Sequence, residues 1–97
     1  MALRVLLQID IQAGRSERFE QLWHDHAARV ATLPDNHGQT LLRRTDRADS
    51  YVVLTDWTDE AAFRSFEQSG PQQTYLKELW AIRAGGSMTL LDVMTNL

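Results

Sequence analysis

The sequence predicts an α+β fold, a ferredoxin-like split βαβ arrangement in which a four-stranded antiparallel sheet carries helices on one face. Four segments have the alternating or β-branched pattern of strands. Helical patterns separate the first strand from the second and the third from the fourth, whereas a turn-rich segment joins the second to the third. With 97 residues, the chain is expected to form a single domain over residues 1–97.

The first strand and the first helix are marked by a change of hydrophobic period. Every second residue from Leu3 to Ile9 is apolar, which predicts a strand with one wholly apolar face. A glycine then breaks the alternation, and Ser16 is suited to cap the helix that follows. We expect this helix to continue to about Leu33, because Pro34 disfavours helical geometry in the residue before it.

The middle of the chain is expected to form a hairpin. Residues 34–38 have turn chemistry, and a strand is expected over 39–44. The arginines and aspartates that follow are typical of a solvated turn with self-compensating charges. Residues 51–57, "YVVLTDW", form the clearest strand of the chain, since they are rich in β-branched and aromatic side chains.

The last third of the chain is expected to contain two helices and a strand. Thr58 is the expected cap of a helix over 59–68. A third helix is expected over 72–83, ended by the Gly85-Gly86 pair. The fourth strand should then occupy 87–94, which completes the order β-α-β-β-α-α-β.

The open face of this sheet predicts a dimer. Helices would cover one face only, yet three of the strands carry apolar residues on both faces. The side chains that would face water in a monomer are Leu6, Val52, Leu54, Leu91 and Val93. A bare face with this many aliphatic side chains is typical of an interface, so we expect a twofold homodimer with sheet packed on sheet.

Composition narrows the functional class. The net charge is −3 without an acidic or basic block, which argues against a nucleic-acid partner or an anionic membrane surface. The absence of cysteine excludes disulfides and thiolate metal sites. The first residues lack the apolar run of a signal peptide or a membrane span, so a soluble cytoplasmic protein is expected.

Two histidines lie close together in the first expected helix. At about 100° per residue, His26 falls within the apolar stripe of Phe19, Leu22 and Val30, whereas His24 falls on the polar side. The inner histidine is either a core residue with satisfied ring nitrogens or a proton acceptor that lines a pocket. Its ordinary pKa of about 6.5 suits a general base near neutral pH. Both interpretations stay open at this point.

Bulky rings favour a pocket over a filled core. The rings that map to the space between helices and sheet are Phe19, Trp23, Trp57, Phe63, Phe66 and Trp80. Flat rings around a cavity suit a flat aromatic ligand, although core packing alone explains any one of them. The histidines have no metal-site spacing and no glycine-rich phosphate loop follows the first strand, so neither a metal nor a bound cofactor is expected.

The segment from His37 to Ser69, "HGQTLLRRTDRADSYVVLTDWTDEAAFRSFEQS", carries a resemblance to a known family. It places in succession a hairpin, a strand that closes on Trp57, and a helix that opens with "DEAAF". Over nearly its whole length, the chain resembles the antibiotic biosynthesis monooxygenase family of small dimeric α+β-barrel proteins. That family includes cofactor-free oxygenases that turn anthrone-like aromatic polyketides into quinones, haem-degrading enzymes, and enzymes that process quorum signals. Some relatives are assigned to polyketide cyclisation.

The resemblance carries over only in part. Trp57 matches the tryptophan that lines the pocket of the quinone-forming oxygenases. Those enzymes also place an asparagine on the same strand face, where this chain has Val53. The haem-degrading branch has a haem-ligating histidine in the region that reads Phe66-Glu67-Gln68 here, so haem is not expected. With the asparagine absent, His26 becomes the expected polar group of the site.

The expected function is cofactor-independent oxidation of a polycyclic aromatic polyketide in antibiotic biosynthesis, from phenol or anthrone to quinone. His26 and Trp57 are the catalytic candidates. The expected substrate-binding residues are Trp23, Tyr51, Thr55, Phe66, Trp80 and Arg83. Two alternatives remain: a polyketide cyclase or aromatase that uses the same pocket without oxygen, and a non-catalytic accessory subunit of a polyketide synthase complex. The missing asparagine favours the cyclase alternative.

Overall fold

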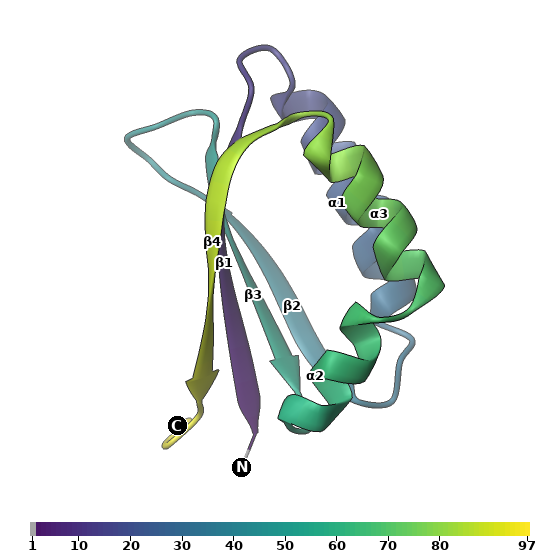
Figure 1. The fold of residues 1–97 in the computed structure, drawn as a ribbon. Coiled ribbons are helices and arrows are strands. Elements are labelled where there is room, and N and C mark those ends of the chain that lie inside the picture. The colour runs from purple at the N-terminus through teal and green to yellow at the C-terminus, as the bar shows by residue number, and fades with distance from the viewer. Residues whose placement is uncertain (1) are drawn as a thin grey trace.

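The structure, a computed structural model, describes residues 2–97 and confirms the expected α+β ferredoxin-like fold. Its elements are β1 (Leu3–Ile11), α1 (Ser16–Val30), β2 (Asn36–Arg43), β3 (Ser50–Trp57), α2 (Glu60–Glu67), α3 (Gly70–Trp80) and β4 (Arg83–Asp92). The four strands form one antiparallel sheet in the order β2-β3-β1-β4. All three helices lie on one face of this sheet (Figure 1).

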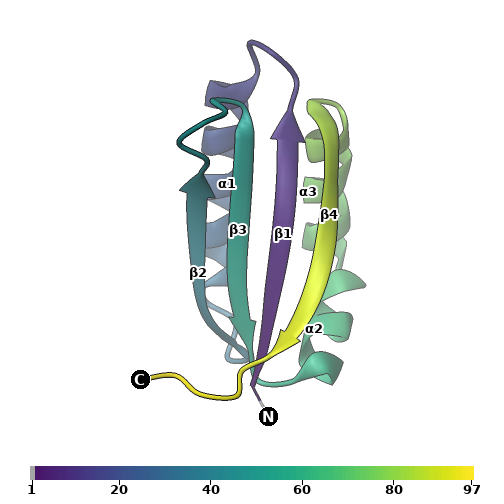
Figure 2. The same ribbon diagram turned by 90° about the vertical axis from the view of Figure 1, so that its left-hand side faces the viewer.

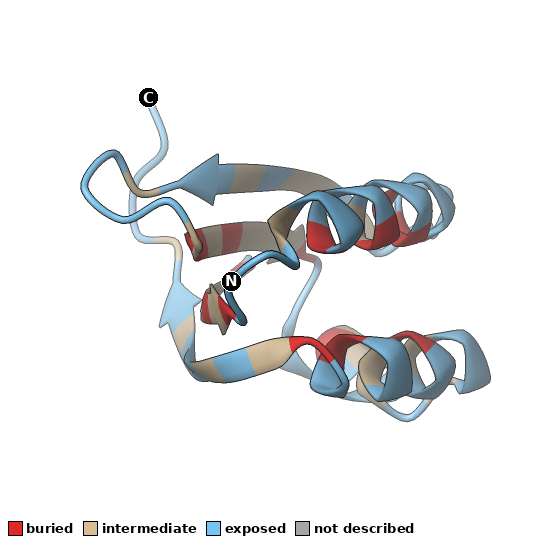
Figure 3. Cartoon of the chain, turned by 90° about the horizontal axis from the view of Figure 1, so that it is seen from above, coloured by how far each residue is buried: buried red, intermediate tan, exposed pale blue. Residues whose placement is uncertain are grey.

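The inner face of the sheet is built by the alternation of β1. This strand lies between β3 and β4, so its apolar side chains reach the middle of the layer beneath the helices. Leu3, Val5 and Ile9 are buried there, as the alternating pattern predicts. α1 lies behind β2 and β3, and α3 lies behind β4 (Figure 2). Buried residues accordingly gather on the inner sides of the helices and in the middle of the sheet (Figure 3).

The boundaries of α1 differ from the expected ones at both ends. Ser16 is the first helical residue and does not cap the helix, because its hydroxyl donates to the Asp49 carboxylate at 2.5 Å. The helix ends at Val30 and not near Leu33. There the backbone N–H of Leu33 donates to the Val30 carbonyl, which turns the chain toward Pro34 in a tighter geometry.

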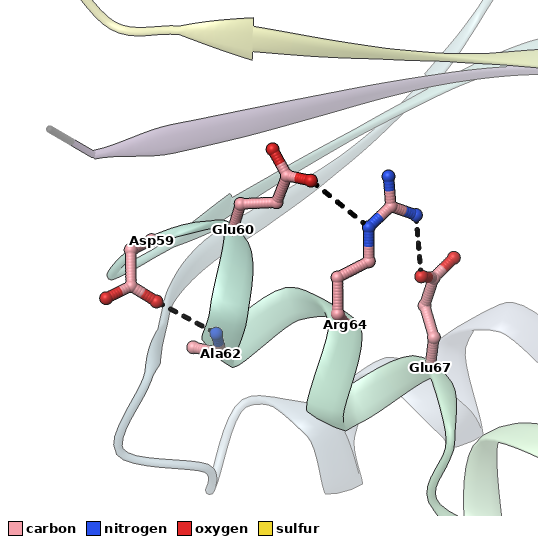
Figure 4. A network of polar contacts seen from close by, with 5 residues as sticks. All are labelled: Asp59, Glu60, Ala62, Arg64 and Glu67. Carbon is pink, nitrogen blue, oxygen red and sulfur yellow. Dashed lines mark hydrogen bonds and ion pairs between the residues drawn. The ribbon is translucent and has the colours of Figure 1, made fainter.

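α2 is capped by Asp59 and not by Thr58. The Asp59 carboxylate accepts the backbone N–H of Ala62 at 2.8 Å, whereas the Thr58 hydroxyl donates to Asp35. On the exposed side of the helix, Arg64 pairs with carboxylates one turn to either side of it (Figure 4). The cap and these ion pairs fix the start of the short helix that carries Phe66 to the inner layer.

Two strands also begin earlier than expected. β2 starts at Asn36, within the segment expected to be a turn, and a register shift between Asn36 and Gly38 accommodates it. β4 starts at Arg83, so the Gly85-Gly86 pair lies inside a strand and does not end a helix. Gly86 faces Ile9 of β1, and a β-carbon there would lie 2.4 Å from the Gln8 carbonyl oxygen. The glycine therefore serves close strand approach.

The other face of the sheet carries no helix (Figure 2). Leu6 and Leu54 lie opposite each other near its middle, next to Val52, and all three are half-buried. Leu42 and Leu91 on the two edge strands are exposed. The uncovered aliphatic face expected from the sequence is therefore present in the single chain. Within residues 2–97, no helix has the length and apolar character needed to cross a membrane.

Candidate active site

A cavity of about 330 Å³ lies between the inner sheet face and the three helices. Its size is within the range of small-molecule sites, and its walls are mostly apolar and aromatic. It brings together nearly all of the residues that the sequence singled out. Those that line it are Trp23, His26, Thr55, Trp57, Phe66, Trp80 and Arg83.

Tyr51 is the exception, because it lies outside the walls of this cavity. Its ring is buried against Phe19, with 4.7 Å between the ring centroids. Its hydroxyl donates to the Glu20 carboxylate at 2.5 Å. Burial and this carboxylate both raise the pKa of the phenol. The structure thus places Tyr51, an expected substrate-binding residue, next to the first half of α1 and away from this cavity.

Trp57 and Thr55 form a fixed pair on the β3 side of the cavity. They lie two residues apart on the same strand face, and the indole N–H of Trp57 donates to the Thr55 hydroxyl at 2.9 Å. The Trp57 ring also packs against Phe66, with 4.6 Å between centroids. Since Trp57 is 1% exposed, these contacts leave it a rigid wall.

His26 is the buried imidazole of the site, as the helical periodicity predicts, whereas His24 is exposed. Only 5% of His26 is exposed, and its ring stacks on Tyr75 with 3.9 Å between centroids and 5° between planes. Nε2 lies 2.7 Å from the Gln72 amide oxygen. Because that oxygen only accepts, Nε2 carries the proton and Nδ1 carries the lone pair. Nδ1 is buried and has no hydrogen-bond partner.

Burial also sets the charge of His26. Removal from water disfavours the imidazolium and lowers the pKa most. The hydrogen bond to Gln72 opposes this in part, and the nearby Arg29 adds the smallest effect, which lowers the pKa again. His26 is therefore neutral at pH 7. A neutral imidazole with an unused lone pair in an apolar site is a group that can accept a proton.

Gln72 and Tyr75 are site residues that sequence reasoning missed. Both line the cavity and both contact His26 from α3, Gln72 in its first turn and Tyr75 at its middle. They lie three residues apart, hence on the same helical face, and Leu79 continues that face into the core. This spacing was the available signal for Tyr75. A glutamine in the first turn of a helix gives no comparable signal.

One end of the cavity is formed by exposed side chains. Trp80 is 51% exposed and Met88 is 43% exposed. The Arg83 guanidinium stacks on the Trp80 ring, with 3.7 Å between Cζ and the ring centroid. Across residues 2–97, no carboxylate forms an ion pair with Arg83. The cavity therefore has a cation held on a ring at its exposed end.

A second cavity of about 360 Å³ adjoins the first between the end of α1 and α2. The two share His26, Val30, Trp57 and Phe66 as lining residues. In the described part of the chain, no three His, Cys, Asp or Glu side chains are grouped as metal ligands would be. The chemistry available from the cavity walls is therefore that of one imidazole, three carboxamides, three hydroxyls, a carboxylate and a guanidinium among rings.

Sequence comparison with known proteins identifies relatives of this chain. A family model described as antibiotic biosynthesis monooxygenase matches residues 2–78. Deoxynogalonate monooxygenase from Streptomyces nogalater is 37% identical over 71 residues, which cover 73% of this chain and 58% of that protein. The chain thus matches little more than half the length of this relative.

The folds of several solved structures match the fold of this protein over almost the entire chain. A mutant of SnoaB, a cofactor-independent oxygenase from Streptomyces nogalater, superposes with a TM-score of 0.90 at 26% identity, covering 99% of this chain and 96% of SnoaB. A protein from Caulobacter crescentus shares the fold with a TM-score of 0.90 at 21% identity, covering 97% of this chain and 91% of its own. Because the family model covers most of the sequence and the fold extends over the rest, this chain belongs to the antibiotic biosynthesis monooxygenase family.

Proposed function

We propose that this protein is a cofactor-independent monooxygenase that oxidises a polycyclic aromatic polyketide in antibiotic biosynthesis, from phenol or anthrone to quinone. The observation that carries the proposal is the ring-lined cavity into whose wall one neutral, buried imidazole is built. The names of two similar proteins, a cofactor-independent oxygenase and deoxynogalonate monooxygenase, support the same class of reaction.

The chemistry begins with an acidic C–H or O–H bond of the substrate. Loss of the proton gives an anion that is delocalised over the rings, and His26 takes up this proton. The electron-rich anion transfers one electron to dioxygen, and the two radicals combine to a peroxide. The peroxide then loses water, so that one anthrone and one dioxygen give one quinone and one water.

The protein contributes to these steps by orienting the substrate, by excluding water from it and by offering a positive charge to its oxyanion. Trp57 and Phe66 offer flat surfaces against which the polycycle can stack, and Thr55 offers a hydroxyl to its oxygens. Arg83 can face an oxyanion from the exposed end. Nδ1 of His26 is covered in the free protein, so the surrounding rings have to part when the substrate binds.

An oxygen electrode with a tricyclic hydroxyanthrone tests the proposal. We expect oxygen uptake and quinone absorbance to rise together at one molecule of each, above the rate of autoxidation. His26→Ala should lower kcat about 100-fold or more, since general base catalysis contributes that much. His24→Ala, which changes an exposed histidine two residues away, should retain the rate. Full activity of His26→Ala would exclude His26 as the base.

A cyclase or aromatase remains the second candidate, because Val53 stands where the oxygenases that this chain resembles place an asparagine. In that case His26 would remove a proton from a poly-β-ketone and promote an aldol closure. The same assay separates the two, because a cyclase changes the absorbance of its substrate without oxygen uptake. An accessory subunit would do neither, with or without His26.

We also propose that the chain forms a homodimer through the uncovered sheet face, which would complete an α+β barrel. The support is the half-exposed aliphatic surface around Leu6 and Leu54. For a chain of this size, burial of that face would add to a small core. The cytoplasmic location expected from the sequence stays a prediction.

A further inference from the structure

We propose that the Gln72 carboxamide is a hydrogen-bond donor for a ring oxygen of the ligand and that His26 holds it in position. The ligand class is a flat polycycle with a ketone or phenolate oxygen. This inference rests on the proposed function for the class of ligand, but not on turnover.

The oxygen and the nitrogen of the Gln72 side-chain amide differ in their hydrogen-bond partners. The Gln72 oxygen accepts the Nε2–H of His26 at 2.7 Å. For the amide nitrogen, no acceptor is present among residues 2–97. The buried side-chain nitrogen and oxygen atoms without a partner in this range are His26 Nδ1 and Asn36 Nδ2, so the Gln72 nitrogen is not enclosed by protein. Because Gln72 lines the cavity, its two N–H groups are available to a ligand.

The Gln72 side chain is held in a fixed position. Gln72 follows Pro71 at the start of α3, where the backbone is fixed. Its partner His26 is 5% exposed and pinned by the stack on Tyr75. A flexible glutamine loses side-chain entropy when it binds a ligand, but this one has already lost it in the hydrogen bond to His26. The contact is therefore preorganised.

The other polar groups of the cavity differ from Gln72 in their position or in their partners. The Gln39 amide nitrogen also belongs to a lining residue, but it donates to the Ala27 carbonyl at 2.8 Å. The Thr55 hydroxyl accepts from Trp57 and keeps its own O–H for a ligand on the β3 side of the cavity. Arg83 lies at the exposed end and on the Trp80 ring. Gln72 is thus the donor in the cavity wall that a hydrogen bond to His26 holds in position.

The arrangement also couples the donor to the base. If His26 takes up a proton on Nδ1, the imidazolium strengthens its Nε2–H bond to the Gln72 oxygen. The amide is then polarised, and its N–H groups become better donors to a developing enolate oxygen. Gain of charge on the base and stabilisation of charge on the ligand would occur through one hydrogen-bonded pair.

A binding comparison with two probes tests the inference without turnover. Anthraquinone-2-sulfonate carries ring oxygens, and anthracene-2-sulfonate has the same flat skeleton and charge without them. Binding is followed by quenching of tryptophan fluorescence, since Trp23, Trp57 and Trp80 all line the cavity. We expect Gln72→Leu to weaken the quinone probe about tenfold, as for one lost hydrogen bond, and to change anthracene-2-sulfonate less than twofold.

Two further variants keep this test decisive. Gln72→Glu retains the shape and removes the donor, so it should lower the preference for the quinone probe as Gln72→Leu does. Gln73→Leu is the matched control, because Gln73 is exposed and its amide donates to the Glu67 carbonyl; it should leave the preference intact. Equal weakening of both probes by Gln72→Leu, unchanged quinone binding, or no binding of either probe would overturn the inference. A selective effect without oxygen uptake would uphold it and count against the proposed function alone.

Discussion

At the scale of single residues, the site depends on one imidazole whose orientation was predictable and whose partners were not. The 100° periodicity of α1 places His26 inside and His24 outside, and the structure agrees. Gln72 and Tyr75 reach His26 from about 46 and 49 positions further along the chain, which no local pattern reports. For Tyr51, the strand alternation predicted the sheet face on which it lies. It could not predict that Glu20 and Phe19 of α1 contact its side chain.

The lowered pKa of His26 predicts a pH-dependent stability. Because the unfolded histidine, with a pKa of about 6.5, binds a proton more readily than the folded one, stability falls as the pH drops below about 6.5 and is fully present above it. Arg29 on α1 acts on the charge of the ring and Tyr75 on α3 stacks on it, whereas Glu67 on α2 and Arg83 on β4 are the other charged groups that line the same cavity. We expect Tm, followed by circular dichroism, to fall more steeply between about pH 7.5 and 5.5 in wild type than in His26→Gln. His24→Gln should retain the wild-type slope, and parallel profiles for wild type and His26→Gln would contradict this origin.

At the scale of elements, the errors concern boundaries and share a cause. The glycine pair at 85 and 86 has the composition of a helix end, and Thr58 has that of a helix cap. In the structure, Asp59 caps α2, because the Thr58 hydroxyl donates to the Asp35 carboxylate instead. The glycines lie inside β4, because a glycine is needed there for the close approach of β4 to β1. The types and order of the elements depend on longer patterns, which is why those were predictable.

The two neighbouring glycines of β4 offer a matched test of this interpretation. A β-carbon at Gly86 would lie 2.4 Å from the Gln8 carbonyl oxygen, whereas the nearest atom to one at Gly85 is a carboxylate oxygen of Asp10 at 3.9 Å. Gly86→Ala should therefore force β4 away from β1 and lower the free energy of unfolding by about 1–3 kcal/mol, as overpacking does. Gly85→Ala should be close to neutral in the same urea titration. Equal effects of the two variants would mean that strand approach does not require the glycine.

At the scale of the whole molecule, the two faces of the sheet differ in role: the inner face lines the cavity, and the outer face is the proposed dimer interface. Side-chain periodicity predicted the apolar inner face, but periodicity cannot distinguish a filled layer from a hollow one such as the cavity found here. The surplus of large rings was the one sequence feature that indicated a hollow. The outer face was predictable because aliphatic residues occupy both parities of β1, β3 and β4, and it carries the argument for a second copy.

A single charge on the outer face should separate the copies. Leu54 lies opposite Leu6 at the middle of that face, so Leu54→Glu would place a carboxylate in the proposed interface, where its desolvation is costly. In light scattering coupled to size exclusion, we expect wild type to have twice the chain mass of 11.1 kDa and Leu54→Glu to have the chain mass. Ala28→Glu adds the same charge on the exposed side of α1 and should remain dimeric with unchanged circular dichroism. If wild type has the chain mass, or if Leu54→Glu keeps twice that mass, the sheet face is not the interface, and its aliphatic side chains need another explanation.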